Sequence, residues 1–296
     1  MLLPRFQYEA PVTVAEACSQ LKEYGDKAKV LAGGTDLLVN MKKKLLAPER
    51  IISLNRIEGL KEMEAVDGGD LAVGSLCTAA ELADSSLIRE RIMVLAEGAG
   101  RLGSPLIRNR ATIGGNLVTA RPASDLAPPL LVLDARLVLT GPEGERKLAV
   151  SDFFLGPGQT RIRGDEVLTR LMIPKAAHPG AGAYIKLGTR KAMEISIVNV
   201  ASYLEMAGDG SLTQVRIALG AVAPVPFLAA SASQKILGAR PKGPEDPLFR
   251  EAAREAAREA KPISDHRGSA EYRRAMVEVL TYRTLKAAYE RLRAVI

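Results

Sequence analysis

The sequence predicts an α+β fold in three parts: two N-terminal lobes at residues 1–55 and 56–174, and a C-terminal α+β domain at residues 175–296. In the first part, strand-like and helical hydrophobic patterns alternate. In the second, short strand-like segments flank a long helical stretch. In the third, two strand-like segments joined by a Gly-Asp-Gly turn precede three helical patterns, and this change marks the last boundary.

The first part contains two helical and two strand-like patterns. Thr13 is a candidate N-cap and Gly25 follows an apolar stripe, which together predict both ends of one helix. A buried strand pattern then leads directly into a Gly-Gly pair. The predicted elements are a helix at 12–25, a strand at Lys29–Leu31, a helix at 36–46 and a strand at Arg50–Leu54.

The elements of the second part are predicted from residues that begin helices and residues that end helices or strands. Thr78 and Glu81 form a capping-box pattern, which indicates a helix start. Segment Leu155–Gly164 contains three glycines and predicts a loop, and Pro174 ends the strand that follows it. The predicted elements are a strand at Leu71–Gly74, helices at Thr78–Ser85 and 86–101, an apolar strand pair at Leu130–Leu139 and a strand at Val167–Ile173. The segment Arg110–Ile113 leads into the second Gly-Gly pair.

The third part begins with a hairpin pattern and continues with helices. The apolar stripe of the last helix can pack in the core or against a partner, and core packing is the commoner use of such a stripe. The stripe consists of Tyr272, Met276, Val279, Leu280, Leu285 and Tyr289. The predicted elements are strands at Ile195–Glu205 and Leu212–Val222 and helices at 226–238, 248–260 and 269–293.

The composition bounds the partners of the chain. An excess of 41 basic over 34 acidic residues gives a net charge of +7, which favours anionic partners. The basic residues are scattered and are not interleaved with aromatic residues, as they are in single-strand binders. A basic nucleic-acid-binding module is therefore the weaker interpretation, and we expect no nucleic acid.

The few cysteines and histidines argue against a metal site on this chain. Cys18 and Cys77 are too few for an iron–sulfur cluster, and His178 and His266 are the only histidines. The apolar runs are too short or too interrupted to span a membrane, and no signal-peptide pattern is evident. We expect a cytoplasmic chain without a metal and without a membrane span.

Two Gly-Gly pairs are the most informative feature. Residues 31–38 read Leu-Ala-Gly-Gly-Thr-Asp-Leu-Leu, and residues 111–125 read Ala-Thr-Ile-Gly-Gly-Asn-Leu-Val-Thr-Ala-Arg-Pro-Ala-Ser-Asp. Glycine lets the backbone approach a ligand closely, and successive free amide N–H groups suit an anion. One pair alone is usually only a turn. The two together predict a ligand with two phosphates, held from both sides.

The loops also carry a family resemblance. Val30–Leu37 and Thr112–Leu117 resemble the two flavin loops of the medium subunit of the molybdenum hydroxylases, which include carbon monoxide dehydrogenase and xanthine dehydrogenase. Pro122–Pro128 and Gly182–Leu187 match the same family pattern. The resemblance implies that FAD binds to a two-lobed FAD-binding fold of the PCMH (vanillyl-alcohol-oxidase-like) type. It also implies a C-terminal α+β domain of the CO dehydrogenase flavoprotein type.

The resemblance implies roles for particular residues. Asp125 matches a flavin-contacting carboxylate, or else it caps the next segment. Lys186 either favours negative charge on reduced flavin or is an exposed strand lysine, and Leu102 and Leu168 line the cofactor or belong to the core. No nucleophile has a base beside it, so no catalytic residue is predicted. The cofactor-binding set is Val30, Leu31, Ala32, Gly33, Gly34, Thr35, Asp36, Leu37, Leu102, Ala111, Thr112, Ile113, Gly114, Gly115, Asn116, Thr119, Ser124, Asp125, Leu168 and Lys186.

The resemblance finally implies partners. A molybdopterin-binding large subunit would oxidise the substrate, and a small subunit with [2Fe–2S] clusters would pass electrons to this chain's FAD. The flavin would then reduce NAD, oxygen or a quinone, in a dimer of heterotrimers. The alternative is a stand-alone FAD-dependent reductase or oxidase on the same fold. That alternative needs a proton donor beside the flavin, and none can be placed from the sequence.

Overall fold

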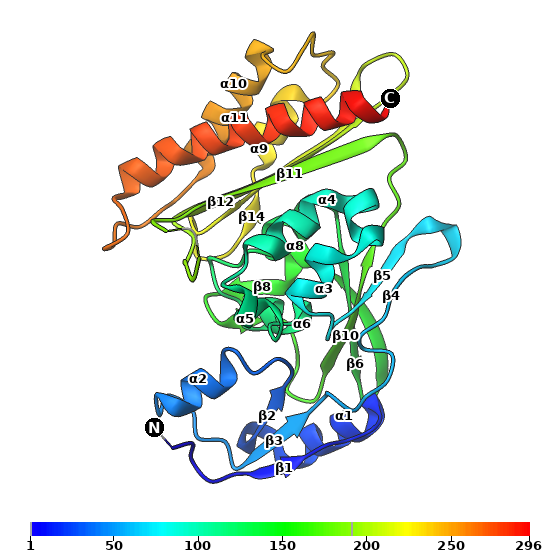
Figure 1. Ribbon diagram of the computed structural model, residues 1–296, viewed down its shortest axis with the longest axis vertical. Coiled ribbons are helices and arrows are strands. Elements are labelled where there is room, and N and C mark those ends of the chain that lie inside the picture. The colour runs from blue at the N-terminus through cyan, green and yellow to red at the C-terminus, as the bar shows by residue number, and fades with distance from the viewer. Residues whose placement is uncertain (1, 191) are drawn as a thin grey trace.

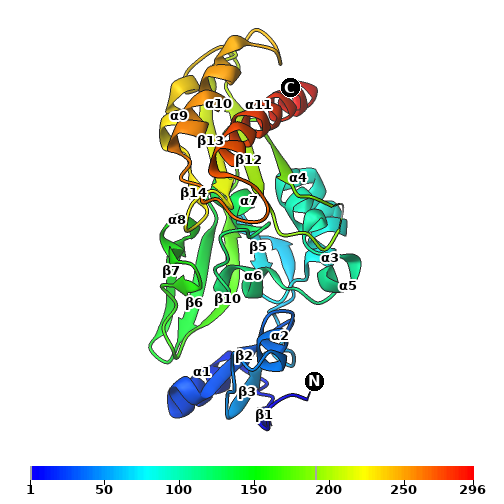
Figure 2. The same cartoon turned by 90° about the vertical axis from the view of Figure 1, so that its left-hand side faces the viewer.

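The computed structural model describes residues 2–190 and 192–296. It is elongated, with its three larger β-sheets following one another along the long axis (Figure 1). The N-terminal lobe occupies one end, the second lobe lies in the middle, and the C-terminal sheet with its helices forms the other end, as Figure 2 shows from the side.

The first lobe is a three-stranded parallel sheet in the order β1-β3-β2. Thr13 caps α1 by accepting a hydrogen bond from the Glu16 amide, and Gly25 ends it with a φ of 51°. The predicted helix and strands are confirmed, but α2 is shorter than the predicted 36–46, and β1 was not predicted. The elements are β1 (Gln7–Glu9), α1 (Val14–Tyr24), the 3₁₀ turn η1 (Gly25–Lys27), β2 (Ala28–Leu31), α2 (Leu37–Lys42) and β3 (Arg50–Ser53).

The second lobe is a five-stranded antiparallel sheet in the order β4-β5-β10-β6-β7. The capping box of Thr78 and Glu81 is present at the start of α3. The elements are β4 (Met63–Ala65), η2 (Asp67–Gly69), β5 (Leu71–Gly74), α3 (Ala79–Asp84), α4 (Ser86–Arg101), α5 (Pro105–Arg108), α6 (Ile113–Val118), α7 (Ala127–Val132), β6 (Arg136–Gly141), β7 (Gly144–Ala149), α8 (Val150–Phe153), β8 (Phe154–Gly156), β9 (Gln159–Thr160) and β10 (Val167–Ile173).

Two predictions for this lobe were wrong. The apolar run Leu130–Leu139 is not a strand pair, because its first residues continue α7 and only β6 is a strand. Prolines in the first turn start α7, and a continuous apolar run fits a buried helix as well as a buried strand. The predicted loop Leu155–Gly164 contains the short hairpin β8–β9, whose turn includes Gly158 at a φ of 73°.

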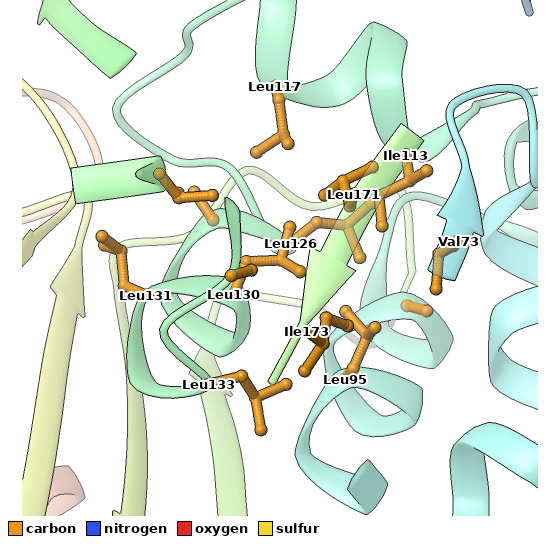
Figure 3. Close-up of a cluster of buried hydrophobic side chains, with 14 of the residues drawn as sticks. Val73, Leu95, Ile113, Leu117, Leu126, Leu130, Leu131, Leu133, Leu171 and Ile173 are labelled. Carbon is orange, nitrogen blue, oxygen red and sulfur yellow. The ribbon is translucent and has the colours of Figure 1, made fainter. Parts of the chain in front are cut away.

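The core of the second lobe lies between its sheet and its helices (Figure 3). Leu95 comes from α4, Ile113 from α6 and Leu130 from α7, and all three are fully buried. They pack in one cluster with Val73 and Leu171 from neighbouring strands of the sheet. This cluster holds α4 and α6 at fixed positions, and both helices reach the site described below.

The C-terminal domain is an antiparallel sheet in the order β11-β12-β13-β14. The last-helix stripe is confirmed as core for Leu280, Leu285 and Tyr289, whereas Tyr272 is 44% exposed. Strand β11 was not among the predicted elements, although one interpretation of Lys186 placed that residue on a strand, because a Gly-Ala-Gly-Ala start is a weak strand signal. The elements are β11 (Gly180–Leu187), β12 (Val198–Met206), β13 (Leu212–Gly220), β14 (Phe227–Leu228), α9 (Ala230–Ile236), α10 (Pro247–Glu259) and α11 (Ala270–Val295).

The two faces of this sheet pack on different partners. One face packs on α9, α10 and α11. The other contributes Tyr184, Ala201 and Ala218 to the core of the second lobe. Arg291 of α11 also donates to the Glu97 carboxylate of α4 and to the Gly182 carbonyl. Within the described ranges, no helix has both the length and the apolar character needed to cross a membrane.

Candidate functional site

A cleft of about 290 Å³ lies between the first and second lobes. Its walls are the loop after β2, the start of α6, the end of α4 and the start of β10. Most of the residues predicted to bind a cofactor meet here, although they come from segments far apart in the sequence. The predicted residues that line it are Val30, Ala32, Gly33, Gly34, Thr35, Asp36, Leu37, Leu102, Ala111, Thr112, Gly114, Gly115, Asn116, Thr119 and Leu168.

The first Gly-Gly loop presents amide groups to this cleft. Strand β2 ends at Leu31, and the chain then turns through Gly34, whose φ is 75°. The Leu38 amide donates to the Gly34 carbonyl, but the amides of residues 34–37 donate to no acceptor in the described part of the chain. Successive unpaired N–H groups at the start of a helix form a place where an anion is stabilised.

The second Gly-Gly pair behaves differently. It lies inside the first turn of α6, where the Gly114 amide donates to the Ser75 carbonyl at 2.9 Å. The Gly115 amide donates to the Thr112 hydroxyl at 3.1 Å. The expectation that both pairs present free amides is therefore wrong for the second pair, because Thr112 is a helix cap and uses one of them.

Both glycine pairs allow close contacts within the protein. A Cβ added at Gly33 would lie 1.9 Å from the Arg110 carbonyl oxygen, and one added at Gly114 would lie 2.8 Å from Ser75. These glycines therefore let the first loop, the segment before α6 and the end of β5 approach one another. The cleft depends on this close packing for its shape.

Ser75 supplies a further polar group that the sequence did not reveal. Ser75 is 2% exposed and lines the cleft, and its hydroxyl has no hydrogen-bond partner among the described residues. The polar side chains of the second loop are engaged instead. The Thr119 hydroxyl donates to the Gly115 carbonyl, and the Asn116 side-chain oxygen accepts from Ser124. The Ser75 oxygen is covered by the surrounding protein, so Ser75 contributes to the wall of the cleft without exposing its hydroxyl to it.

The remaining walls are apolar. Leu102 and Leu168 are 7% and 4% exposed and both line the cleft, as do Leu76, Ile107 and Val167. A flat aromatic ring buries its faces against side chains of this type. The cleft thus combines anion-binding amides with a surface suited to a ring.

A second and larger hollow of about 740 Å³ adjoins this cleft. It lies between the two lobes and the C-terminal domain, and it shares Asp36 and Asn116 with the first cleft. Ser124 and Asp125 line it. The cleft and the larger hollow together form one joined cleft, which is bounded by all three parts of the chain. A long ligand with different groups at its two ends could lie along it. Of the remaining predicted residues, Leu31, Ile113 and Lys186 line neither hollow.

Asp125 forms a buried ion pair at the wall of the larger hollow. Its carboxylate accepts from Lys186 at 2.7 Å, from the Tyr184 hydroxyl at 2.7 Å and from Ser196 at 3.1 Å. The side chains of Asp125 and Lys186 are each 7% exposed. The interpretation of Lys186 as an exposed strand lysine was therefore wrong. Tyr184 of β11 and Ser196 just before β12 were missed, because they reach Asp125 only through the packing of the C-terminal sheet on the second lobe.

Burial is the largest influence on the pKa of the Asp125 carboxyl. It raises the pKa of Asp125 above its ordinary value, and the charge and hydrogen bond of Lys186 act in the opposite direction. Burial, together with the nearby Asp125 charge, places the pKa of Tyr184 well above its ordinary value. The Tyr184 hydroxyl is thus a permanent donor at neutral pH.

The described part of the chain offers no grouping of metal-ligating side chains. Cys18 and Cys77 are both buried and unpaired. Burial raises the pKa of Cys77 to about 12, so its thiol is protonated at neutral pH. Across residues 2–190 and 192–296, no three His, Cys, Asp or Glu side chains lie together in a way that could hold a metal ion.

Comparisons with known proteins agree with this geometry. The family described as the FAD binding domain in molybdopterin dehydrogenase matches residues 4–176, and the CO dehydrogenase flavoprotein C-terminal domain matches residues 183–288. The chain is 34% identical to the carbon monoxide dehydrogenase medium chain of Hydrogenophaga pseudoflava, over 98% of this chain and 99% of that protein. It is 29% identical to the xanthine dehydrogenase FAD-binding subunit of Escherichia coli O157:H7, over 95% of each.

Solved structures give the same result. A structure of carbon monoxide dehydrogenase from Hydrogenophaga pseudoflava superposes with a TM-score of 0.92 at 34% identity, covering 98% of this chain and 99% of that chain. Quinoline 2-oxidoreductase from Pseudomonas putida 86 superposes with a TM-score of 0.90 at 27% identity, covering 99% of each. The chain belongs to the family of FAD-binding medium subunits of the molybdenum hydroxylases.

Proposed function

We propose that the joined cleft holds one noncovalent FAD and that the chain is an electron-transfer subunit. The observation that carries this proposal is the set of unpaired amides at residues 34–37 facing the cleft that Ser75 also lines. Bound FAD supplies a ring that takes up and releases one or two electrons. The chain would supply binding, orientation and electrostatics.

The residues divide into two proposed roles. The amides of residues 34–37 would donate to the diphosphate oxygens, since N–H donors match anionic acceptors. Leu102 and Leu168 would pack against a ring of the cofactor and exclude water from it. The other predicted cleft residues complete the contact set, while Ile113 is fully buried and supports α6 from the core.

The buried group at Asp125 would have a positioning role. Asp125 belongs to the second lobe, and its partners Tyr184 and Lys186 belong to β11 of the C-terminal domain. The group therefore fixes the wall of the larger hollow where these two parts meet. We propose the boundaries 1–55, 56–174 and 175–296 for the three parts, supported by the separate larger sheet that each part contains.

The partner subunits and the path of the electrons belong to the same proposal. Relatives of this chain are the medium chain of carbon monoxide dehydrogenase and the FAD-binding subunit of xanthine dehydrogenase. We propose that a molybdopterin subunit and a [2Fe–2S] subunit accompany this chain in a cytoplasmic dimer of heterotrimers. Electrons would enter from the [2Fe–2S] subunit and leave to NAD, oxygen or a quinone.

Flavin uptake tests the binding proposal. The full chain, mixed with FAD and desalted, should retain one flavin per chain, measured by visible absorption and by release on denaturation. Gly33→Val should lose the flavin, because its side chain would displace the loop against the Arg110 carbonyl. Gly243→Ala is the matched control, since a Cβ there meets nothing within 4 Å. Wild-type protein that retains no flavin would refute the proposal.

Purification from the native source tests the partners. The expected result is three polypeptides that co-elute, with molybdenum and iron in the same fractions. Steady turnover of an organic substrate by the isolated FAD-loaded chain would instead favour a stand-alone reductase or oxidase.

A further inference from the structure

A separate cavity of about 590 Å³ lies away from the flavin cleft. It opens between the ends of β5 and β10, the middle of α4 and the exposed end of the C-terminal sheet. None of its lining residues lines the flavin cleft or the adjoining hollow. Its volume falls in the range of small-molecule sites.

The floor of this cavity is polar. The register of β12 with β13 sets Tyr203 opposite Arg216 and Glu205 opposite Gln214, and all four line the cavity. Further along the same strands, the equivalent positions are occupied by buried alanines in the core of the second lobe. The sheet thus changes from an apolar face to a polar one where the cavity begins.

Tyr203 is the central group of the floor. It is 7% exposed, and its hydroxyl forms no hydrogen bond with any described residue. A Cβ added at Gly180 would lie 2.2 Å from this hydroxyl, so the glycine leaves the space that the hydroxyl occupies. Burial and the nearby Glu205 raise the pKa of Tyr203 to about 12, so the hydroxyl keeps its proton at neutral pH. Its hydroxyl is not among the buried unpaired oxygens, so it is accessible from the cavity and is an available donor.

The walls and the mouth have different chemistry. Ile92, Leu133 and Ile173 form an apolar wall, and Leu133 and Ile173 are seen from the core side in Figure 3. Arg91 and Lys175 are exposed at the rim, and neither forms an ion pair with a described carboxylate. Both can therefore bind an anionic group without first breaking an internal pair.

The balance of charge favours an anion. Three cationic side chains, of Arg91, Lys175 and Arg216, line the cavity against two carboxylates, of Asp134 and Glu205. Arg216 is already paired with Asp134 at 3.4 Å, and Glu205 accepts from the His178 amide. The backbone amide does not neutralise Glu205, which has no cationic partner among the described residues, so the lining keeps a net charge of +1, with Arg91 and Lys175 at the mouth and Glu205 on the floor.

We propose that this cavity binds a small aromatic carboxylate that carries a polar group at its far end. The carboxylate would bind Arg91 and Lys175 at the mouth, the ring would pack on Ile92 and Leu133, and the far polar group would bond Tyr203 on the floor. Each ligand part faces the cavity surface that matches its chemistry. The site belongs to the chain itself and does not depend on bound FAD.

Calorimetric titration of the full chain tests the proposal, with phenylacetate and para-hydroxyphenylacetate as probes. The hydroxylated probe should bind more tightly, by roughly five- to tenfold, which is the gain from one hydrogen bond to a neutral partner. Tyr203→Phe should remove that difference and leave phenylacetate binding unchanged. Lys175→Met should weaken both probes, and Lys147→Met, at an exposed lysine on β7, should weaken neither.

Two outcomes would overturn the proposal. One is that neither probe binds the wild-type chain at millimolar concentration. The other is that binding is unaffected by both Tyr203→Phe and Lys175→Met, although urea unfolding shows the variants to be folded. Each titration is run with FAD-loaded and FAD-free protein, and flavin content is measured separately. Failure of this site and failure of flavin binding are therefore distinguishable.

Discussion

Asp36 places a carboxylate beside the amides that are proposed to hold a diphosphate. It is exposed, lies at the start of α2 and makes no capping hydrogen bond there. A negative charge at this position weakens the attraction of the loop for phosphate, because like charges repel through partly screened solvent. The exposed side chain indicates that solvent limits the cost of this charge.

Asp36→Asn should therefore tighten FAD binding, by about two- to fivefold at low ionic strength. The gain should shrink as salt is added. The dissociation constant is measured by quenching of flavin fluorescence. Asp26→Asn removes the same charge from an exposed residue of the first lobe outside the cleft and should change nothing. Weaker binding of FAD by Asp36→Asn would show that the carboxylate contacts the cofactor favourably.

Lys186 and Asp125 should be treated as a pair. The sequence predicts that Lys186 favours negative charge on the reduced flavin, but its ammonium group is bonded to Asp125 at 2.7 Å. The neighbouring carboxylate offsets that charge. Lys186→Met would leave Asp125 buried without a cation, which should lower the free energy of unfolding by about 3 kcal/mol.

The double variant Asp125→Asn/Lys186→Met isolates the interaction. It should recover much of the stability lost in Lys186→Met, because no unpaired charge remains. Urea unfolding at pH 7 measures all variants. Additive losses in the double variant would show that the two groups do not interact energetically.

Among the elements, the turn before β10 is tied to β7 by a charged contact. Arg146 of β7 donates to both oxygens of Glu166, at 2.7 and 2.8 Å. This hydrogen bond is the main reason that the pKa of Glu166 lies below its ordinary value of 4.5. A carboxylate with a lowered pKa stabilises the fold above its ordinary pKa, and this contribution is lost as the pH falls through the folded value.

Glu166→Gln should thus lower the free energy of unfolding by about 1–2 kcal/mol at pH 7. The difference from wild type should persist down to about pH 5 and then shrink as Glu166 is protonated. Urea unfolding across this pH range measures it. Glu143→Gln, at a side chain that is 92% exposed, is the matched control. A difference that stays constant below pH 4 would contradict the role of the Glu166 charge.

The elements also show what could be predicted from sequence. The helices with side-chain caps, at Thr13 and Thr78, were predicted because a cap and an apolar stripe are local signals. Strand β11 and helix α7 were missed or misassigned, because packing rather than propensity determines them. The two Gly-Gly loops identified the cleft. Ser75 and Tyr184 could not be identified, since their roles arise from contacts with residues distant in sequence.

For the whole molecule, bound FAD should act as a bridge between its parts. A ligand that binds only the folded chain adds about 2.7 kcal/mol of stability when present at a hundred times its dissociation constant. For a chain of this size we expect the thermal midpoint to rise by roughly 5–10 °C. Differential scanning calorimetry with FAD measures the shift. Riboflavin lacks the diphosphate and should give a much smaller one. Equal shifts with both ligands would exclude the loop amides as the diphosphate site.

The core shared by the second lobe and the C-terminal sheet has a consequence for modularity. The two family matches divide the chain between residues 176 and 183, yet Tyr184, Ala201 and Ala218 complete the core on the far side of that division. Dividing the chain at this point would expose apolar surface on both fragments. Chimeras that exchange the C-terminal domain between relatives should therefore fold poorly when the two parents differ at this shared core. Substitutions on the two sides of the division are expected to be correlated.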